Sequence, residues 1–273
     1  MLDTDTLPGE ALPLPAVARD GAGWPLLRVL RAVRSPELGN ERDIVVALPP
    51  RYAEQPERRW PVLYLQDGQN LIDPAASYAG HWQVGETLAY WAPRGVEAIV
   101  VAIPNMGAER LQEYGAFADP RHGGGRGGRY ARFVVETLKR RIDEEFRTVA
   151  GPEGTVMGGS SMGGLISLVT GALFPHAIGT VLVMSPSLWY AQWRVFDWLE
   201  ARPHLPRRIH LDVGLAEPDE EIYDVRRLAR WLLDHEYTVP GTLRFIEAEE
   251  EGHNEAAWAR RFREALPWLV GAG

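Results

Sequence analysis

The sequence contains no cysteine among its 273 residues. This absence excludes disulfides, thiolate metal sites and a cysteine nucleophile. No apolar run approaches the roughly 18 residues that a membrane-spanning helix needs, so we expect no membrane span. Residues 1–8 show neither the basic nor the apolar stretch of a signal peptide, which predicts a cytoplasmic protein. A mature secreted protein whose leader has been removed would look the same.

Net positive charge is also lacking, since 37 acidic residues outnumber 29 basic ones and give a formal net charge of −8. This excess disfavours a nucleic acid or an anionic membrane as partner. No two histidines stand at metal-ligand spacing with a carboxylate, so we expect no metal and no other cofactor. At 45% hydrophobic and 24% charged residues, the composition is that of an ordinary globular chain with a sizeable core.

Eight short apolar runs predict the strands of a single sheet. The first two, 26–33 and 42–48, are joined through Gly39 and Asn40, which suits an antiparallel hairpin with the first strand at the sheet edge. Most of the others are continuously apolar, as parallel strands covered on both faces must be. They are 61–65, 97–103, 154–157, 180–184, 208–213 and 242–246.

Helical patterns separate these runs and predict repeated β-α units behind the hairpin. They cover about 82–91, 129–146, 162–174, 219–236 and 254–266. Residues 1–25 are rich in proline, glycine and alanine and predict an irregular lead-in, so that 26–273 forms a single catalytic domain.

A strand, a tight glycine turn and a helix are predicted around Ser161. The sequence Gly159-x-Ser161-x-Gly163 fits the nucleophile-elbow pattern, in which a strained strand-to-helix turn presents a serine. The glycines allow the backbone to pass close to the strand and the helix without a clash at Cβ. The motif alone leaves open an ordinary glycine-rich turn that happens to contain a serine.

Three reactive residues, Ser161, Glu217 and His253, each follow a predicted strand, where open α/β sheets bind their ligands. Serine, acid, histidine is the chain order of hydrolase triads on such sheets. His253 would take the proton of Ser161, and Glu217 would orient the imidazole. Other carboxylates remain open as the acid: Asp219 first, then Asp212 and Asp224.

The negative charge that develops during acyl transfer needs two preorganised N–H donors. Met162 follows the serine and begins the next helix, so its N–H is the first candidate. The second candidate is the N–H of Gln69, because the neighbouring Gly68 allows the backbone to approach the site closely.

Two groups of side chains are candidates for contact with a substrate. Trp189 and Trp193 follow the sixth strand and could stack on a sugar or a phenolic acyl group, or simply pack in a surface loop. Arg110 lies in the long connection 104–128 and could meet an anionic group. Arg121 and Arg126 share that connection, and all three arginines could equally be solvated. The predicted partner is a small-molecule or glycan-linked ester, with the oligomeric state left open.

Several motifs together resemble the Putative esterase family of α/β hydrolases. They are residues 64–73, 158–164, 185–189 and 252–254. The family includes enterochelin, feruloyl and acetyl-xylan esterases and, more distantly, mycolyltransferases. The resemblance runs from about residue 27 to 268 and implies an α/β-hydrolase fold: a mostly parallel eight-stranded sheet with an antiparallel N-terminal hairpin and helices on both faces. It implies a serine esterase with its triad at Ser161, Glu217 and His253 and oxyanion donors at Gln69 and Met162. Some members work with a serine–histidine pair and no acid.

The sequence therefore predicts a serine carboxylesterase that acts through an acyl-enzyme. The alternatives are a catalytically silent binding or scaffold protein of the same fold, and an acyltransferase. Two acidic runs, 217–221 and 247–251, include or adjoin predicted catalytic residues. If the carboxylates of 247–251 lie near His253, they favour its charged form and raise its pKa, so activity would need a more alkaline pH.

Overall fold

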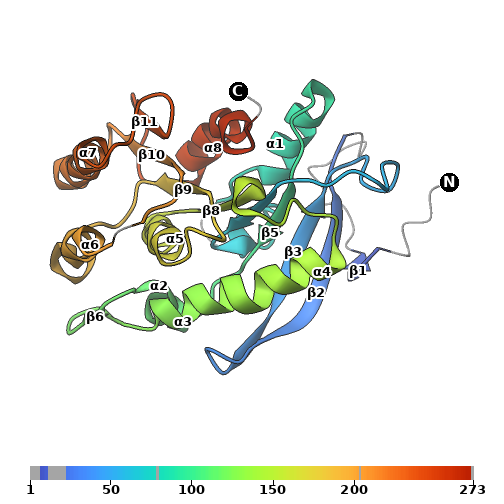
Figure 1. Ribbon diagram of the computed structural model, residues 1–273, viewed down its shortest axis with the longest axis horizontal. Coiled ribbons are helices and arrows are strands. Elements are labelled where there is room, and N and C mark those ends of the chain that lie inside the picture. The colour runs from blue at the N-terminus through green and yellow to red at the C-terminus, as the bar shows by residue number, and fades with distance from the viewer. Residues whose placement is uncertain (1–6, 12–22, 78–79, 203, 272–273) are drawn as a thin grey trace.

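The computed structural model describes residues 7–11, 23–77, 80–202 and 204–271. Among them, nine strands form one sheet in the order β1-β2-β3-β5-β4-β8-β9-β10-β11 (Figure 1). From β5 to β11 in this order, neighbouring strands pair in parallel, and the pairs β1–β2, β2–β3 and β3–β5 are antiparallel. Their bounds are β1 (Glu10–Ala11), β2 (Leu26–Ser35), β3 (Asn40–Leu48), β4 (Val62–Leu65), β5 (Ile99–Ala102), β8 (Thr155–Ser160), β9 (Thr180–Met184), β10 (Arg208–Gly214) and β11 (Leu243–Ala248).

The eight predicted strands are all present, and the ninth, β1, lies within the predicted irregular lead-in. Its residues Glu10 and Ala11 pair with Val29 and Arg28 of β2. Arg28 also donates side-chain hydrogen bonds to the carbonyls of residues 7–9, which holds this short segment against the sheet. The first predicted strand is therefore not the edge of the sheet. The remainder of the lead-in prediction, at 1–6 and 12–22, lies outside the described residues.

Helices cover both faces of the sheet, as predicted. They are α1 (Val84–Trp91), α2 (Arg110–Tyr114), α3 (Gly127–Arg132), α4 (Arg140–Glu145), α5 (Met162–Leu173), α6 (Tyr190–Glu200), α7 (Asp219–Asp234) and α8 (Glu255–Leu269). A π-helical segment, Phe133–Lys139, joins α3 to α4. No described helix combines the length and the apolar character that crossing a lipid bilayer would require.

Two apolar layers sandwich the sheet, because successive strand residues point to opposite faces. In β4, Leu63 and Leu65 pack in the layer that contains α1 and α8, the two helices seen side by side in Figure 1. Val62 and Tyr64 pack in the other layer, with the helices from α3 to α7. All four side chains are almost fully buried. Because the parallel strands all run in the same direction, their C-terminal ends lie at one edge of the sheet, between the two layers.

Two connections contain structure that the sequence pattern did not predict. The long connection 104–128 holds α2 and a small hairpin formed by β6 (Ala118–Asp119) and β7 (Gly123–Gly124). Helix α6 follows β9 and is interrupted by three successive non-glycine residues with positive φ: Ala191, Gln192 and Trp193, at 52°, 58° and 58°. Left-handed backbone is unfavourable for such residues, and the interruption explains why no helical period was recognised there.

Candidate active site

Ser161 stands in a strained turn between β8 and α5. Its backbone has φ 56° and ψ −125°, outside the regions that L-residues favour. A Cβ added to Gly159 would lie 2.8 Å from the carbonyl group of Gly163, so this crossing requires glycine. The Ser161 N–H donates to the carbonyl of Met184 at the end of β9 (3.0 Å). The strand–turn–helix arrangement predicted from the glycine pattern is thus present.

The hydroxyl of Ser161 is 3.1 Å from the hydroxyl of Ser187. The Ser187 N–H also donates to the Ser161 carbonyl (3.1 Å), which fixes the two residues relative to each other. Within the described residues, Ser161 and His253 share no direct hydrogen bond, but both line the same cavity. Catalytic hydrogen bonds are often long without substrate and tighten only in the complex.

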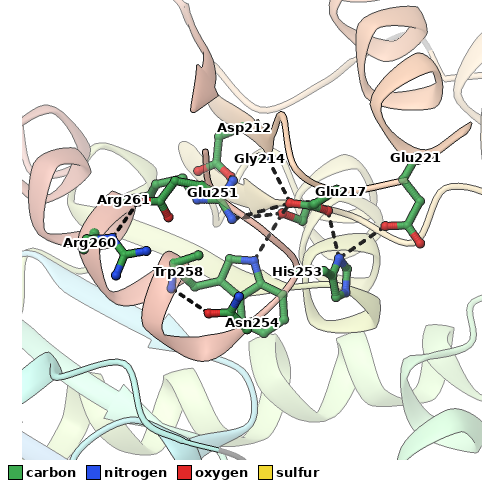
Figure 2. A network of polar contacts seen from close by, with 12 residues as sticks. Asp212, Gly214, Glu217, Glu221, Glu251, His253, Asn254, Trp258, Arg260 and Arg261 are labelled. Carbon is green, nitrogen blue, oxygen red and sulfur yellow. Dashed lines mark hydrogen bonds and ion pairs between the residues drawn. The ribbon is translucent and has the colours of Figure 1, made fainter. Parts of the chain in front are cut away.

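His253 follows β11 and directs its Nδ1 toward two carboxylates (Figure 2). Nδ1 lies 2.8 Å from Oε2 of Glu217 and 3.2 Å from Oε2 of Glu221. Glu217 comes from the loop after β10, and Glu221 from the first turn of α7. Nε2 has no hydrogen-bond partner in the described part of the chain. His253 is therefore held through one nitrogen and leaves the other free to accept a proton.

Glu217 is the best-anchored carboxylate of the site. Its side chain is 0% exposed, and its Oε1 accepts hydrogen bonds from the Ser185 hydroxyl (2.5 Å) and the Gly214 N–H (2.8 Å). The Arg261 guanidinium lies 3.7 Å from the same oxygen. Burial alone would raise the pKa of Glu217, but the hydrogen bonds from His253, Ser185 and Gly214 outweigh it and lower the pKa. Glu217 is consequently held in its ionised form.

The two carboxylates also determine how His253 titrates. Burial disfavours the imidazolium, yet the hydrogen bonds to Glu217 and Glu221 outweigh burial and raise the pKa of His253 to about 9. The pKa of His253 is raised, as the sequence predicted, but the carboxylates that raise it are not the predicted ones. In the run 247–251, Glu247 pairs with Arg226 and Glu251 pairs with Arg260. The carboxylates that raise the pKa come from 217–221.

The alternative acids have other partners. Asp212 is paired with Arg261 (2.8 Å) and His210 (2.9 Å). Asp224 accepts a hydrogen bond from the Trp193 indole (2.5 Å), and Asp219 lines a separate cavity of about 480 Å³. Glu217, and none of these three aspartates, is paired with His253 among the described residues.

The predicted oxyanion donors come from the segment after β4 and from the first residue of α5, next to the serine. A Cβ on Gly68 would lie 2.6 Å from the carbonyl carbon of Ala102, so glycine is required for the loop after β4 to pass here. Gln69, the next residue, lines the cavity together with Ser161. In the described chain, neither the Gln69 N–H nor the Met162 N–H donates to a protein acceptor. Both are free to bind an oxygen of a ligand.

The cavity beside Ser161 has a volume of about 820 Å³, within the range of small-molecule sites. Arg110, a predicted substrate contact, lines it at the start of α2. Its guanidinium is already engaged, because Nε and a terminal nitrogen bind the two carboxylate oxygens of Asp67 at 2.7 and 2.9 Å. Asn105 donates to the same carboxylate (2.6 Å).

The other predicted substrate contacts lie away from this cavity. Trp193 lines the separate cavity that contains Asp219. Trp189 packs against the ring of His122, with centroids 5.4 Å apart. Arg126 donates a hydrogen bond to the carbonyl of Leu38. Neither Arg126 nor Arg121 is among the residues that line the cavity at Ser161. The left-handed turn at 191–193 separates Trp189 from Trp193 and changes the direction of the chain between them.

Sequence reasoning assigned no role to several residues of the site. Glu221 lies in the same acidic run as Glu217, at the start of the predicted helix 219–236, and its place in that run was the available signal. Ser185 and Ser187 lie in a motif that was recognised without a role for either serine. Arg261 could not have been found, because nothing in its helix marks it as the partner of a distant carboxylate.

Glu217, Glu221 and His253 also form a group that could hold a metal ion, since one ligand atom of each lies within 4.8 Å of the others. The same atoms already contact one another, since His253 Nδ1 forms a hydrogen bond with Glu217 and an ion pair with Glu221. This direct contact is the arrangement of an acid–histidine pair, which orients the imidazole and stabilises its charged form.

Comparison with known proteins places the fold among esterases. The chain is similar to the uncharacterized protein YbbA of Bacillus subtilis, with 26% identity over 85% of this chain and 94% of the relative. It superposes on the BES protein from Bacillus cereus with a TM-score of 0.70 and 22% identity, covering 89% of this chain and 94% of that one. For the enterobactin esterase FES from Shigella flexneri, the TM-score is 0.71 and the identity 20%, over 90% of this chain and 59% of that one.

The structural likenesses establish the α/β-hydrolase fold, and a family model establishes the membership. The model described as Putative esterase matches residues 35–269, which include every residue of the site described above. Membership in a family of ester hydrolases supports an esterase function. The chain belongs to the Putative esterase family.

Proposed function

We propose that the protein is a serine carboxylic-ester hydrolase in which Ser161, His253 and Glu217 act as a triad through an acyl-enzyme. The observation that carries the proposal is the 2.8 Å contact between His253 Nδ1 and the buried Glu217, beside a serine held in a strained elbow. A hydrogen bond at Nδ1 selects the tautomer whose Nε2 is a base. The proposed substrate is a small-molecule or glycan-linked ester.

In the first half-reaction, His253 Nε2 takes the proton of Ser161 while Oγ attacks the acyl carbon. The carbonyl oxygen becomes an oxyanion, to which the free N–H groups of Gln69 and Met162 donate. His253 then gives its proton to the leaving alkoxide. Glu217 stabilises the transient imidazolium, and water repeats the sequence on the acyl-enzyme to release the acid.

The contact between Ser161 and Ser187 bears on how the first step begins. With Oγ 3.1 Å from the Ser187 hydroxyl and not bonded to His253, the nucleophile is in a resting position. Rotation about χ1 is a low-barrier motion between staggered wells. We propose that substrate binding turns Oγ toward His253, and that Ser187 holds the resting rotamer.

The test is the hydrolysis of p-nitrophenyl acetate by the Ser161→Ala variant. Loss of the nucleophile should lower kcat by a factor on the order of 10⁶, to the residual rate that binding and the oxyanion site supply. Ser160→Ala is the matched control, because it removes a neighbouring hydroxyl and should retain kcat within about tenfold. Full activity in Ser161→Ala would exclude the proposed mechanism.

A further inference from the structure

The charged side chains that line the cavity beside Ser161 are not balanced. Besides His253, they are Asp67, Glu255 and Arg110, two carboxylates against one guanidinium. The positive charge of His253 is offset by the carboxylates of Glu217 and Glu221, which both contact its Nδ1. A cavity lined by a net negative charge attracts cations and repels anions. The sign of this imbalance therefore bears on which esters can bind.

The positive charge of Arg110 is already compensated by a carboxylate of the protein, which weakens its attraction for an anionic substrate. It binds both oxygens of Asp67 in the bidentate geometry that is strongest for such pairs. Its guanidinium also lies over the ring of Tyr114, 5.0 Å from the centroid. Burial disfavours its charged form, but the bonds to Asp67 outweigh burial and raise the pKa of Arg110. The cation of the cavity is thus neutralised by the protein itself.

Glu255 is the carboxylate that remains. It is the first residue of α8 and forms no ion pair within the described residues. Burial raises the pKa of Glu255, and the nearby Asp67 adds to this effect; the backbone N–H of Glu255, His253 and Arg110 stabilise its negative charge only in part. Gly80 closes over this side chain, since a Cβ at Gly80 would lie 3.3 Å from the Cβ of Glu255. An incoming positive charge would find an acceptor here.

Aromatic rings in the same cavity favour the same class of ligand. Trp82 and Trp258 both line it, with ring centroids 6.3 Å apart and planes inclined at 47°. Both residues belong to the buried apolar cluster and are only 3% and 6% exposed, so they give the cavity an apolar wall that suits the alkyl substituents of an ammonium group. An unpaired carboxylate beside two tryptophans is a chemical environment suited to a substituted ammonium group.

We infer that the esterase prefers substrates that carry a quaternary ammonium group, in the acyl or the alcohol half of the ester, over neutral esters of the same shape, and that Glu255 is the residue responsible. This inference rests on the proposed function, because it assigns the substrate class of the same cavity. The preference is a matter of charge alone, so isosteric pairs of esters isolate it.

Two pairs of esters test the inference at pH 8. Butyrylthiocholine and 3,3-dimethylbutyl thiobutyrate differ by one charge in the alcohol half. The p-nitrophenyl esters of 4-(trimethylammonio)butanoic and 5,5-dimethylhexanoic acids differ likewise in the acyl half. Because the chain has no cysteine, released thiol can be measured with Ellman's reagent without interference. In at least one pair, we expect kcat/KM to favour the cationic ester on the order of tenfold.

Glu255→Gln should reduce that preference toward unity, and Glu220→Gln, which lies outside the cavity, should leave it unchanged. Each ratio is taken within one variant, so it does not depend on the fraction of active enzyme. Equal or better hydrolysis of the neutral ester in both pairs would overturn the inference, as would a preference that survives Glu255→Gln. If the neutral esters and p-nitrophenyl acetate are not hydrolysed at all, the proposed function fails as well.

Discussion

The acidic run 217–221 follows strand β10, and the run 247–251 begins at the end of the neighbouring parallel strand β11, yet the two runs have very different surroundings. Glu217 is fully buried, and Glu221, with 27% of its side chain exposed, shares the same imidazole nitrogen. Glu247 and Glu251 instead pair with Arg226 and Arg260, whose side chains are 55% and 61% exposed. Only the first run contacts His253.

The difference is one of solvent and donors, not of composition. Around Glu217, the Gly214 N–H and the Ser185 hydroxyl satisfy the carboxylate in the absence of water, so its charge acts on His253 with little screening. The pairs of Glu247 and Glu251 involve exposed arginines, and such surface pairs contribute little. Two runs with equal numbers of carboxylates can therefore have unequal effects on the pKa of one histidine, and here the run farther away in sequence has the larger effect.

The largest effect should come from Glu217→Gln. The amide cannot stabilise the imidazolium and offers a poorer acceptor to Nδ1–H, so kcat on p-nitrophenyl acetate should fall by about 10³–10⁴. Glu251→Gln is the counterpart from the other run and should stay within about twofold. If Glu217→Gln kept a third of the activity, a serine–histidine pair would suffice, and the contrast between the runs would lose its catalytic meaning.

A smaller effect is expected from Glu221→Gln, seen in the pH profile. His253 must be neutral to accept a proton, and with a pKa of about 9 the wild-type kcat/KM should rise as the pH approaches that value. Removing one carboxylate favours the neutral form, so the acid limb should move to lower pH by about one unit. Glu220→Gln leaves the His253 contacts intact and should show no shift.

The 247–251 run provides the reverse test. Replacing Glu249, Glu250 and Glu251 together by glutamine should leave the acid limb in place, within about 0.2 pH unit. The sequence alone predicted that these carboxylates raise the pKa of His253, so that their removal would shift the acid limb. An unchanged acid limb would support the contacts with 217–221 instead. An acid-side shift as large as that of Glu221→Gln would mean that the run acts on His253 after all.

The smallest effect should appear in the dependence of stability on pH. The folded-state pKa of His253 is raised from 6.5 to about 9, so protonation stabilises the fold. The contribution is complete below pH 6.5 and is lost as the pH rises through 9. Urea unfolding curves give the free energy of unfolding at each pH. Between pH 6 and 9.5, this free energy should fall further in the wild type than in Glu221→Gln, by on the order of 1 kcal/mol. Parallel curves for the two proteins would contradict the raised pKa.

The parts of the site that were predictable depend on local pattern. The glycines around Ser161 and the position of His253 and Glu217 after strands follow from strand period, turn chemistry and chain order. The bidentate pair of Asp67 and Arg110 joins residues 43 positions apart, and no local pattern reports such a contact.

The placement of the tryptophans was not predictable for a related reason. Trp189 and Trp193 follow a strand end, as a substrate contact would, but the left-handed turn at 191–193 breaks the helical period and redirects the chain. Because that period is missing, the sequence does not indicate α6, and the directions of the Trp189 and Trp193 side chains could not be predicted. Backbone strain imposed by tertiary packing leaves no signature in residue type when no glycine marks it.

The central claim, that Ser161 is an activated nucleophile, is tested most directly by labelling the folded protein with a fluorophosphonate and mapping the adduct by peptide mass spectrometry. The account predicts one adduct per chain, on Ser161, absent in Ser161→Ala and formed much more slowly in Glu217→Gln. No adduct on the folded wild type, or an adduct on another residue, would contradict it and favour a catalytically silent protein of this fold.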